Sequence, residues 1–476
     1  WRESLIATST HCYDSGSLWI EESVWTVIAP TDAGPQYWGA GGEIVVWRSF
    51  DEGGSWLRAQ TLTANSTYNH TYVRRPLGAA EGFYAFWADG SPDARTASHL
   101  YFCTAEGGVF RTMYKTRFLL FLLAAALSGV PAEAAGKRDT EIANRVAQWQ
   151  IDNFGEHLSR PGTRSDQHWA NGALYRGMLT WADVSGYKPC EEFVLEIGRR
   201  NGWRMGRRQY HADDICVGQA SLMLYERYRD PAMLRPVKQR ADSVIAFPAQ
   251  TKMHIKAKNG SNRWSWCDAL FMAPPVYALL ANVTGDNGYR EFMNREFYAS
   301  SRSLFDAAEG LYYRDARYFG KREKNGEKVF WGRGNGWCYA ALAILLDTLP
   351  ESDPTYDYYR RMFLRMSEAV VACQDARGSW HPSMLDHETY PMPENSASGF
   401  FTYGLAWGVN RGLLTAPVYK RAARRGWKAL CSHVGPDGRL GYVQPIGGSP
   451  QRTNREMTEV YGVGAFLMAA SEIVRM

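Results

Sequence analysis

A short segment near residue 120 divides the chain and limits what either side of it can fold into. Residues 113–117 are a short basic start, residues 118–127 (FLLFLLAAAL) are an uninterrupted apolar run, and residues 128–134 end in a small-x-small pattern. This order is typical of a secretory signal peptide. The apolar run is about half of the roughly 20 residues that a membrane-spanning helix needs. A buried core helix is the alternative, but we expect export to the periplasm or medium, without stable membrane insertion.

The place of this segment in the chain predicts three divisions. A signal peptide belongs at an N-terminus, whereas this one follows about 112 residues. We therefore expect a first piece at 1–112, the signal-peptide-like segment at 113–135 and a second piece at 136–476. The sequence leaves open whether 1–112 is a genuine part of the protein or an upstream reading frame joined to a secreted protein that begins at Met113.

Residues 1–112 have the pattern of a β protein. Strand-like runs such as 43–47 (EIVVW) and 82–87 (GFYAFW) are separated by Gly, Ser, Asp and Pro clusters. Residues 49–56 (SFDEGGSW) fit the Asp-box S-x-D-x-G-x-x-W, in which Asp caps backbone amides and Gly takes a positive φ. The segment resembles the last blades of a BNR-repeat β-propeller. A propeller has four to eight blades, and this length supplies about two, so we expect a partial propeller-like, all-β fragment.

Residues 136–476 change to helical periodicity. Apolar residues recur every three or four positions, as in 220–225 and 340–346. Alternate stretches differ: one set is apolar and rich in Gly and Ala, as inner helices are, and the other carries more charge. No fixed-period repeat indicates a solenoid. We expect a mainly α fold, an (α/α)6 barrel, whose twelve helices begin near Asp139, Trp169, Cys190, Asp213, Pro231, Trp266, Gly288, Gly336, Tyr356, Ser396, Pro417 and Thr458.

Charge and cysteine spacing exclude several classes of function. The net charge is +5 and no long basic run is present, so nucleic-acid binding has no electrostatic footprint. The eight cysteines include no C-x-x-C pair, and we expect neither a metal nor a cofactor. The aromatic content of 14% suits either a large core or a cleft that stacks on sugar rings.

Polar and aromatic clusters recur at the expected starts of the inner helices. If these helices run parallel, the clusters gather at one end of the barrel, where helix N-termini favour an anionic ligand. Plain helix capping is the alternative for Asp213, Asp214 and Ser396. The clusters are 167–172, 211–214, 264–268, 333–337 and 394–398.

Two of these motifs carry a family resemblance. Residues 266–275 (WCDALFMAPP) and 330–337 (FWGRGNGW) resemble glycoside hydrolase family 105, the unsaturated rhamnogalacturonyl hydrolases, which are related to the family 88 unsaturated glucuronyl hydrolases. Residues 211–214, 310–318 and 396–403 agree with it in order. The resemblance implies a six-hairpin glycosidase. Such an enzyme releases a Δ4,5-unsaturated uronic acid from the non-reducing end of lyase-generated oligosaccharides, with rhamnose the family's usual next sugar.

The implied reaction hydrates a vinyl ether rather than attacking the anomeric carbon. A carboxylic acid protonates C4, water adds at C5, and the product opens and releases the next sugar. The resemblance assigns the proton donor to Asp268, and the apolar neighbours of Asp268 favour the protonated form. Asp213 is the second expected catalytic carboxylate, although the sequence does not separate it firmly from Asp214.

The resemblance also implies a set of substrate contacts. Arg333 suits a fork contact with a carboxylate or sugar hydroxyls, and Trp337 and Trp169 suit stacking on the unsaturated ring. Some relatives carry His where this chain has Arg314, and an Arg there suits a more anionic next sugar, sulfated or uronate-bearing. The expected substrate-binding residues are Trp169, His211, Asp214, Trp266, Arg314, Arg333, Asn335 and Trp337.

Three other functions fit the same barrel. They are a conventional inverting glycosidase with two separated carboxylates, a polysaccharide lyase, and a non-catalytic glycan-binding protein. The ultraviolet absorbance of the unsaturated uronate separates them, because hydration removes it, ordinary hydrolysis leaves it and a lyase creates it. The sequence does not fix the identity or sulfation of the next sugar, the disulfides or the oligomeric state.

Overall fold

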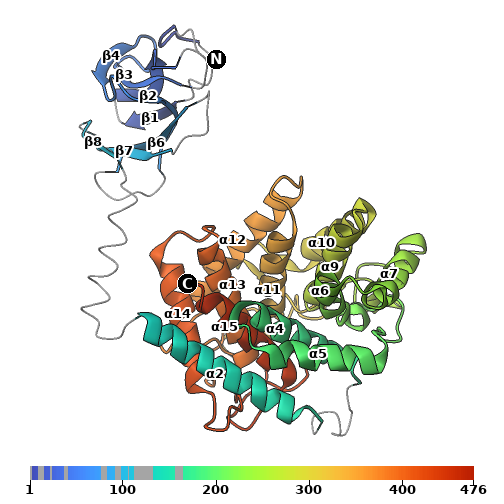
Figure 1. The fold of residues 1–476 in the computed structure, drawn as a ribbon. Helices are drawn as coiled ribbons and strands as arrows, with labels where there is room; N and C mark the ends of the chain where they lie inside the picture. Colours follow the sequence, from blue (N-terminus) through green and yellow to red (C-terminus); the bar gives the residue numbers. More distant parts are fainter. Residues whose placement is uncertain are drawn as a thin grey trace. The chain divides into compact units, whose positions relative to one another are not determined.

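The computed structural model of the chain divides into two compact units, Trp1–Pro131 and Ala132–Met476 (Figure 1). It describes residues 3–8, 16–21, 24–36, 41–76, 83–91, 98–105, 107–111, 132–155 and 165–476. The expected signal segment lies outside the described residues up to position 131, so the export signal stays a prediction.

The first unit is all β in the part that the structure describes. Its strands form two four-stranded antiparallel sheets, each in sequential order (Figure 1). Trp19, Ile28, Val46 and Trp87 pack between the sheets as part of a small core. Two open sheets confirm the expected all-β fragment, which is not a closed propeller, and the relation to BNR propellers stays a prediction. The strands are β1 (Ser17–Glu21), β2 (Val24–Asp32), β3 (Glu43–Ser49), β4 (Leu57–Thr61), β5 (Asn69–Arg74), β6 (Ala85–Gly90), β7 (Leu100–Cys103) and β8 (Val109–Arg111).

The turn between β3 and β4 has the geometry that the Asp-box pattern predicts. The Asp51 carboxylate accepts from the Ser55 amide at 2.8 Å and the Ser55 hydroxyl at 2.7 Å. These hydrogen bonds lower the pKa of Asp51 to about 2. Gly53 has a φ of 83°, a conformation that disfavours a side chain. The motif therefore serves the turn itself.

The second unit contains twelve helices of eleven or more residues within its described part, and they alternate between two layers (Figure 1). The outer helices are α2 (Ala132–Asp152), α5 (Lys188–Asn201), α7 (Pro231–Ala246), α10 (Asn287–Leu304), α12 (Tyr356–Ala372) and α14 (Pro417–Ser432). The inner helices are α4 (Trp169–Ser185), α6 (Gly218–Tyr228), α9 (Pro274–Thr284), α11 (Gly332–Thr348), α13 (Asn395–Asn410) and α15 (Val460–Ile473).

The inner helices form a closed ring. Each packs against the next in the order α4, α6, α9, α11, α13 and α15, and α15 packs against α4. Each outer helix packs against an inner neighbour. Residues 332–346 of α11 are all buried, whereas α14 buries a single stripe of small and apolar residues. The alternating composition of the helices follows from these two environments, and the (α/α)6 barrel is confirmed.

A close approach of two glycines lets the ring close. A Cβ atom added to Gly177 of α4 would lie 2.3 Å from the Gly464 carbonyl oxygen of α15. Because real Cβ atoms do not approach backbone atoms so closely, any side chain at this crossing forces the two helices apart.

Three inner helices begin at places other than those expected. The helix expected from Asp213 begins at Gly218, after the short 3-10 helix η1 (Ala212–Ile215). The helix expected from Trp266 begins at Pro274, after the short helix α8 (Ala269–Met272), because Pro274 lacks the amide that would continue α8. The helix expected from Gly336 begins at Gly332. Asp213 and Asp268 therefore lie in segments that lead into inner helices, and Arg333 lies within the first turn of one.

We expect Gly177→Ala to lower the free energy of unfolding by about 1–3 kcal/mol, the usual cost of overpacking a well-packed site. The measurement is urea unfolding followed by the circular dichroism of the helices. Gly155→Ala is the control, because a Cβ at Gly155 meets nothing within 4 Å. Equal unfolding midpoints for the two variants would contradict this account of ring closure.

Candidate active site

Two carboxyl groups stand in the segments that lead into α6 and α9. Asp213 lies in η1, whose first amides are capped by His211: the Asp213 amide donates to His211 Nδ1 at 3.4 Å. Asp268 immediately precedes α8 and is 9% exposed. The negative charge of Asp268 raises the pKa of Asp213, so the two expected catalytic carboxyls lie within electrostatic range of each other.

Asp213 is a carboxyl poised to carry a proton near neutral pH. Burial and then the negative charge of Asp268 raise its pKa to about 7. The nearest cation, Arg208, attracts it only weakly, because Arg208 Nη2 is 3.8 Å from Asp213 Oδ2. Its side chain is still 18% exposed, so the group is reachable from outside. Such a carboxyl suits general acid–base chemistry.

Asp214 has a different role from its neighbour. Its carboxylate accepts from the Arg208 amide at 2.7 Å and from Arg208 Nε at 3.0 Å. Burial alone would raise its pKa, but the hydrogen bonds from Arg208 lower it. A Cβ at Gly206 would lie 2.5 Å from the Asp214 carboxyl carbon, so this carboxylate fills the turn at 206–208. Asp214 therefore fixes a loop, which separates it from Asp213.

His211 and Trp266 pack together beside Asp213. Their ring centroids are 4.8 Å apart. Burial, followed by the charge of Arg208, lowers the pKa of His211 to about 4, so the imidazole is neutral at physiological pH. Trp266 is buried and pairs through its backbone with Asp315. His211 and Trp266, which the sequence predicts to contact the substrate, thus lie next to Asp213 and Asp268.

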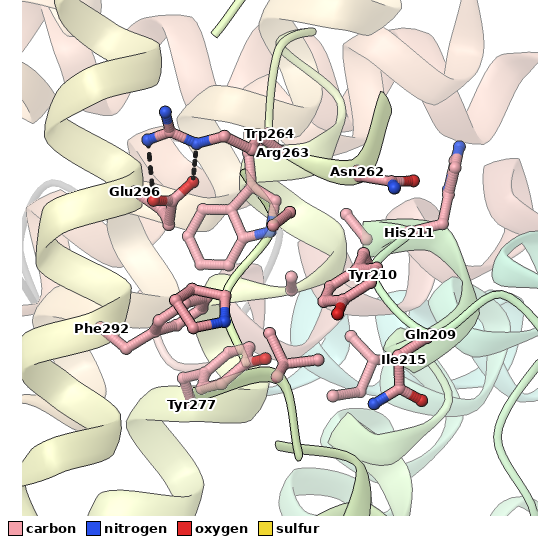
Figure 2. A pocket seen from close by; sticks show the side chains of 15 residues that line it. Gln209, Tyr210, His211, Ile215, Asn262, Arg263, Trp264, Tyr277, Phe292 and Glu296 are labelled. Atoms are coloured by element: carbon pink, nitrogen blue, oxygen red, sulfur yellow. Dashed lines mark hydrogen bonds and ion pairs between the residues drawn. The ribbon is translucent and has the colours of Figure 1, made fainter. Parts of the chain in front are cut away.

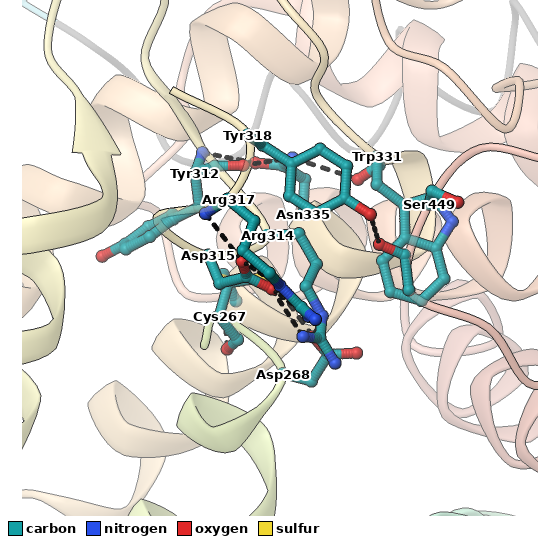
Figure 3. A network of polar contacts seen from close by, with 12 residues as sticks. Cys267, Asp268, Tyr312, Arg314, Asp315, Arg317, Tyr318, Trp331, Asn335 and Ser449 are labelled. Atoms are coloured by element: carbon teal, nitrogen blue, oxygen red, sulfur yellow. Dashed lines mark hydrogen bonds and ion pairs between the residues drawn. The ribbon is translucent and has the colours of Figure 1, made fainter. Parts of the chain in front are cut away.

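Arg314 lies between two carboxylates (Figure 3). Its Nε is 3.6 Å from Asp268 Oδ2, and its Nη1 donates to Asp315 Oδ2 at 2.6 Å. Burial disfavours the charged guanidinium, yet the charge of Asp268 and the hydrogen bond to Asp315 raise the pKa of Arg314. In the structure this residue contacts the expected catalytic carboxylate, where the sequence predicted a contact with the sugar.

Arg333 is placed differently from the sequence-based prediction. Its side chain is 1% exposed and donates to the carbonyls of Gln444 and Pro445, the latter at 2.9 Å. It also lies over the rings of Trp331 and Tyr461, at 4.5 Å and 4.8 Å from their centroids. The guanidinium therefore holds a loop to α11 rather than presenting a free fork to a ligand.

The other two residues of the same motif are also buried. Asn335 accepts from the Tyr312 amide at 2.7 Å and donates to the Tyr312 carbonyl at 3.0 Å, so it clamps the strand β10 (Leu311–Tyr312). Trp337 is 0% exposed and meets Trp169 edge to face at 5.9 Å. Trp169 is partly exposed and stacks on Tyr461. Of the two expected stacking residues, Trp169 thus keeps some exposed surface, and the buried Trp337 packs against its ring.

Two buried carboxylates were missed as site residues by the sequence analysis. Asp315 is 0% exposed and binds Arg314 and Arg317. Glu394 is also 0% exposed, and it caps α13 in place of the expected Ser396, accepting from the Ala397 amide at 2.8 Å and the Gln444 amide at 3.0 Å. The Arg-Asp-x-Arg spacing at 314–317 is a local sequence signal for Asp315. Glu394 accepts one of its hydrogen bonds from Gln444, which lies 50 positions away in the sequence.

A small cavity of about 30 Å³ lies beside His211, between the segments that precede α6 and α9 and the outer helix α10. Trp264, Tyr277 and Phe292 line it together with the ion pair of Arg263 and Glu296 (Figure 2). Neither Asp213 nor Asp268 is among its lining residues.

Two further findings concern the described residues only. Among them, no cluster of three His, Cys, Asp or Glu side chains is placed to bind a metal ion. No helix of the described part is both long and apolar enough to span a membrane.

We expect the stability of Asp213→Asn to differ from that of the parent in a pH-dependent way. Folding raises the pKa of Asp213 from 3.8 to about 7, so its contribution is complete below 3.8 and is lost as the pH rises through about 7. The free energy of unfolding of the parent should therefore fall relative to the variant between pH 4 and 8, by at most about 4 kcal/mol.

The neighbouring variant Asp214→Asn is the control, because its difference from the parent should stay constant between pH 5 and pH 8. Because the pKa of Asp214 is lowered in the folded state, its contribution is present above the unfolded pKa. Urea unfolding at pH 5 and pH 8 measures both variants. A parallel pH response of the two would show that Asp213 is not the proton-carrying carboxyl.

Comparison with known proteins identifies the barrel. Residues 142–476 match the model of Glycosyl Hydrolase Family 88. An unsaturated 3S-rhamnoglycuronyl hydrolase of Alteromonas sp. (strain LOR) is 36% identical over 362 residues, which cover 72% of this chain and 88% of that protein.

Two solved structures resemble it as well. A glycosyl hydrolase family 88 protein from Bacteroides vulgatus is 29% identical with a TM-score of 0.64, covering 71% of this chain and 99% of that one. A protein named as a polysaccharide lyase is 31% identical with a TM-score of 0.64, covering 72% and 98%. The family model spans the whole ring of inner helices together with the carboxyl pair, and the chain therefore belongs to Glycosyl Hydrolase Family 88.

Proposed function

We propose that the barrel releases a Δ4,5-unsaturated uronic acid from the non-reducing end of an oligosaccharide by hydrating its C4=C5 bond. The observation that carries the proposal is the pair Asp213 and Asp268. One of these carboxyls has a pKa of about 7, and the other lies beside a guanidinium. Near neutral pH such a pair can both give a proton and accept one.

The reaction follows from the electron-rich double bond. The pair delivers a proton to C4, which leaves an oxocarbenium-like centre at C5. Water adds at C5 and gives up a proton to the pair. The resulting hemiketal opens, and the next sugar leaves without a further catalyst. No cofactor enters these steps, and the family resemblance of residues 266–275 supports a role for Asp268 in them.

We further propose that the next sugar is a sulfated rhamnose. The support is the name of the Alteromonas relative, which specifies a 3S-rhamnoglycuronyl substrate. A polysaccharide lyase is the second candidate, because one similar structure bears that name.

The absorbance of the unsaturated uronate tests the reaction. We expect the parent to abolish the absorbance of a lyase-generated disaccharide, and Asp268→Asn to act at least about a hundredfold more slowly, because a positioned acid or base contributes 10²–10⁴. Asp286→Asn is the matched control, since Asp286 caps the outer helix α10 and Asn caps equally well.

Two other results would contradict the proposal. Sugar release at constant absorbance would indicate a conventional glycosidase. Rising absorbance on an intact polysaccharide would indicate a lyase.

The proposed sulfate requirement has its own test. We expect kcat/KM to be at least about tenfold higher for the sulfated disaccharide than for its desulfated form, the size of one charge-assisted contact of about 1.5 kcal/mol. The preference should weaken as salt rises, because salt screens exposed charges. Equal kcat/KM values for the two sugars would contradict a sulfated rhamnose as the natural partner.

A further inference from the structure

An open groove lies on the side of the barrel, between the outer helices α10 and α12 (Figure 1). Its volume is about 520 Å³, which falls within the range of about 300–1,000 Å³ that ligand sites occupy. The cavity beside His211 is far smaller, at about 30 Å³. Neither Asp213 nor Asp268 lines the groove, so it is separate from the candidate active site.

The side chains that line the groove recur along one face of each helix. On α10 they include Arg295, Tyr298 and Arg302, and on α12 they are Tyr358 and Met362. Residues spaced three or four positions apart share a helix face. The groove is therefore built from two facing stripes of aromatic, apolar and basic side chains.

Two tyrosines form the floor of the groove. The rings of Tyr298 and Tyr358 meet edge to face with their centroids 4.4 Å apart, and both side chains keep some exposed surface. Phe305 and Met362 extend the apolar lining. An aromatic ring with a polar tip suits a ligand that has both apolar faces and hydroxyl groups, as a sugar ring has.

Two arginines give the groove a positive charge that the protein does not neutralise. Arg295 is 58% exposed, and the carboxylate of Glu296, 3.9 Å from it, is already bound by Arg263 through two hydrogen bonds. Arg302 is exposed and forms no ion pair with a described residue. Its charge acts on the phenol of Tyr358, where it opposes the rise in pKa that burial causes. Among the described residues, no carboxylate lines the groove.

A ligand for this groove needs ring faces that pack on tyrosine and anionic groups that pair with arginine. A polysaccharide of sulfated or uronate sugars offers both, because its rings present C–H faces and its anionic oxygens accept paired hydrogen bonds from a guanidinium. A neutral glycan would leave the arginines without a partner. An acidic peptide would supply the charge without a repeated ring.

We propose that this groove is a second binding site, outside the candidate active site, for the anionic polysaccharide from which the unsaturated oligosaccharides derive. The inference takes its choice of ligand from the proposed function and goes beyond it. A polymer held in the groove takes no part in the reaction. It keeps the barrel close to the place where a lyase produces new unsaturated ends.

Binding to immobilised polymer tests the site. The probe is a set of beads that carry a polysaccharide of sulfated rhamnose and uronic acid, and beads that carry neutral dextran are the reference. We expect the sulfated beads to deplete the parent protein from solution and the dextran beads to leave it there. The depletion should weaken as salt rises, because salt screens exposed charges.

Two changes in the groove should weaken this binding. The double variant Arg295→Gln with Arg302→Gln should bind the sulfated beads at least about tenfold more weakly, the size of one lost charge-assisted contact. Tyr358→Leu keeps the charge and removes an aromatic ring, and it should bind at least about threefold more weakly. Because both arginines are exposed, the double variant keeps the test decisive if Tyr358→Leu does not fold.

The double variant Arg421→Gln with Arg424→Gln is the matched control. Both arginines are exposed on the outer helix α14, and their replacement removes the same two charges from the protein. The control should bind the sulfated beads as the parent does. All of these variants should keep the parent's kcat/KM on the unsaturated disaccharide, because the groove lies outside the candidate active site.

Four outcomes overturn the inference. They are a parent that the sulfated beads do not deplete, equal depletion by the dextran beads, equal losses in the groove and control double variants, and a folded Tyr358→Leu variant that binds as tightly as the parent. If the binding behaves as expected but the parent leaves the disaccharide absorbance unchanged, the failure lies in the proposed function and not in the groove.

Discussion

The packing of α15 against α4 closes the ring of inner helices, and the place of every functional side chain depends on that closure. Because consecutive helices of a barrel of hairpins run in opposite directions, all inner helices begin at one end. The segments that lead into them meet there: Asp213 before α6, Asp268 before α9, Arg333 in the first turn of α11 and Glu394 before α13. Residues about 180 positions apart in the chain, such as Asp213 and Glu394, thus come to the same end of the barrel.

The charged residues at this end of the barrel fall into two sets, which differ in how fully they are buried and hydrogen-bonded. A charged group with no exposed surface persists only when it is fully paired, because desolvation is expensive. Asp315, Glu394 and Arg333 meet that demand with several hydrogen bonds each, so they hold loops in place. Asp213 and Asp268 keep some exposure and fewer bonds. Asp213 and Asp268 therefore remain available for chemistry, because they are not used to hold loops in place.

Sequence-based prediction succeeded for local features of the chain and failed where a residue's place depends on distant contacts. The twelve helices were predictable because the apolar period of a helix is a local property of ten to twenty residues. Their starts near Asp213 and Trp266 were wrong, because short turns of helix precede α6 and α9. The choice between Asp213 and Asp214 depends on a turn in which Arg208 bonds the Asp214 carboxylate and lies 3.8 Å from the Asp213 carboxyl. The partners of Arg333 lie 111 and 112 residues away, beyond any local pattern, so its expected contact with substrate could not be weighed against them.

The seven cysteines of the described residues are all free thiols, and six of them are buried. The five buried cysteines of the barrel, Cys190, Cys216, Cys267, Cys338 and Cys373, fill space as small apolar groups. Within the described residues no disulfide cross-links the barrel, and its closure is carried by the packing of its helices against one another.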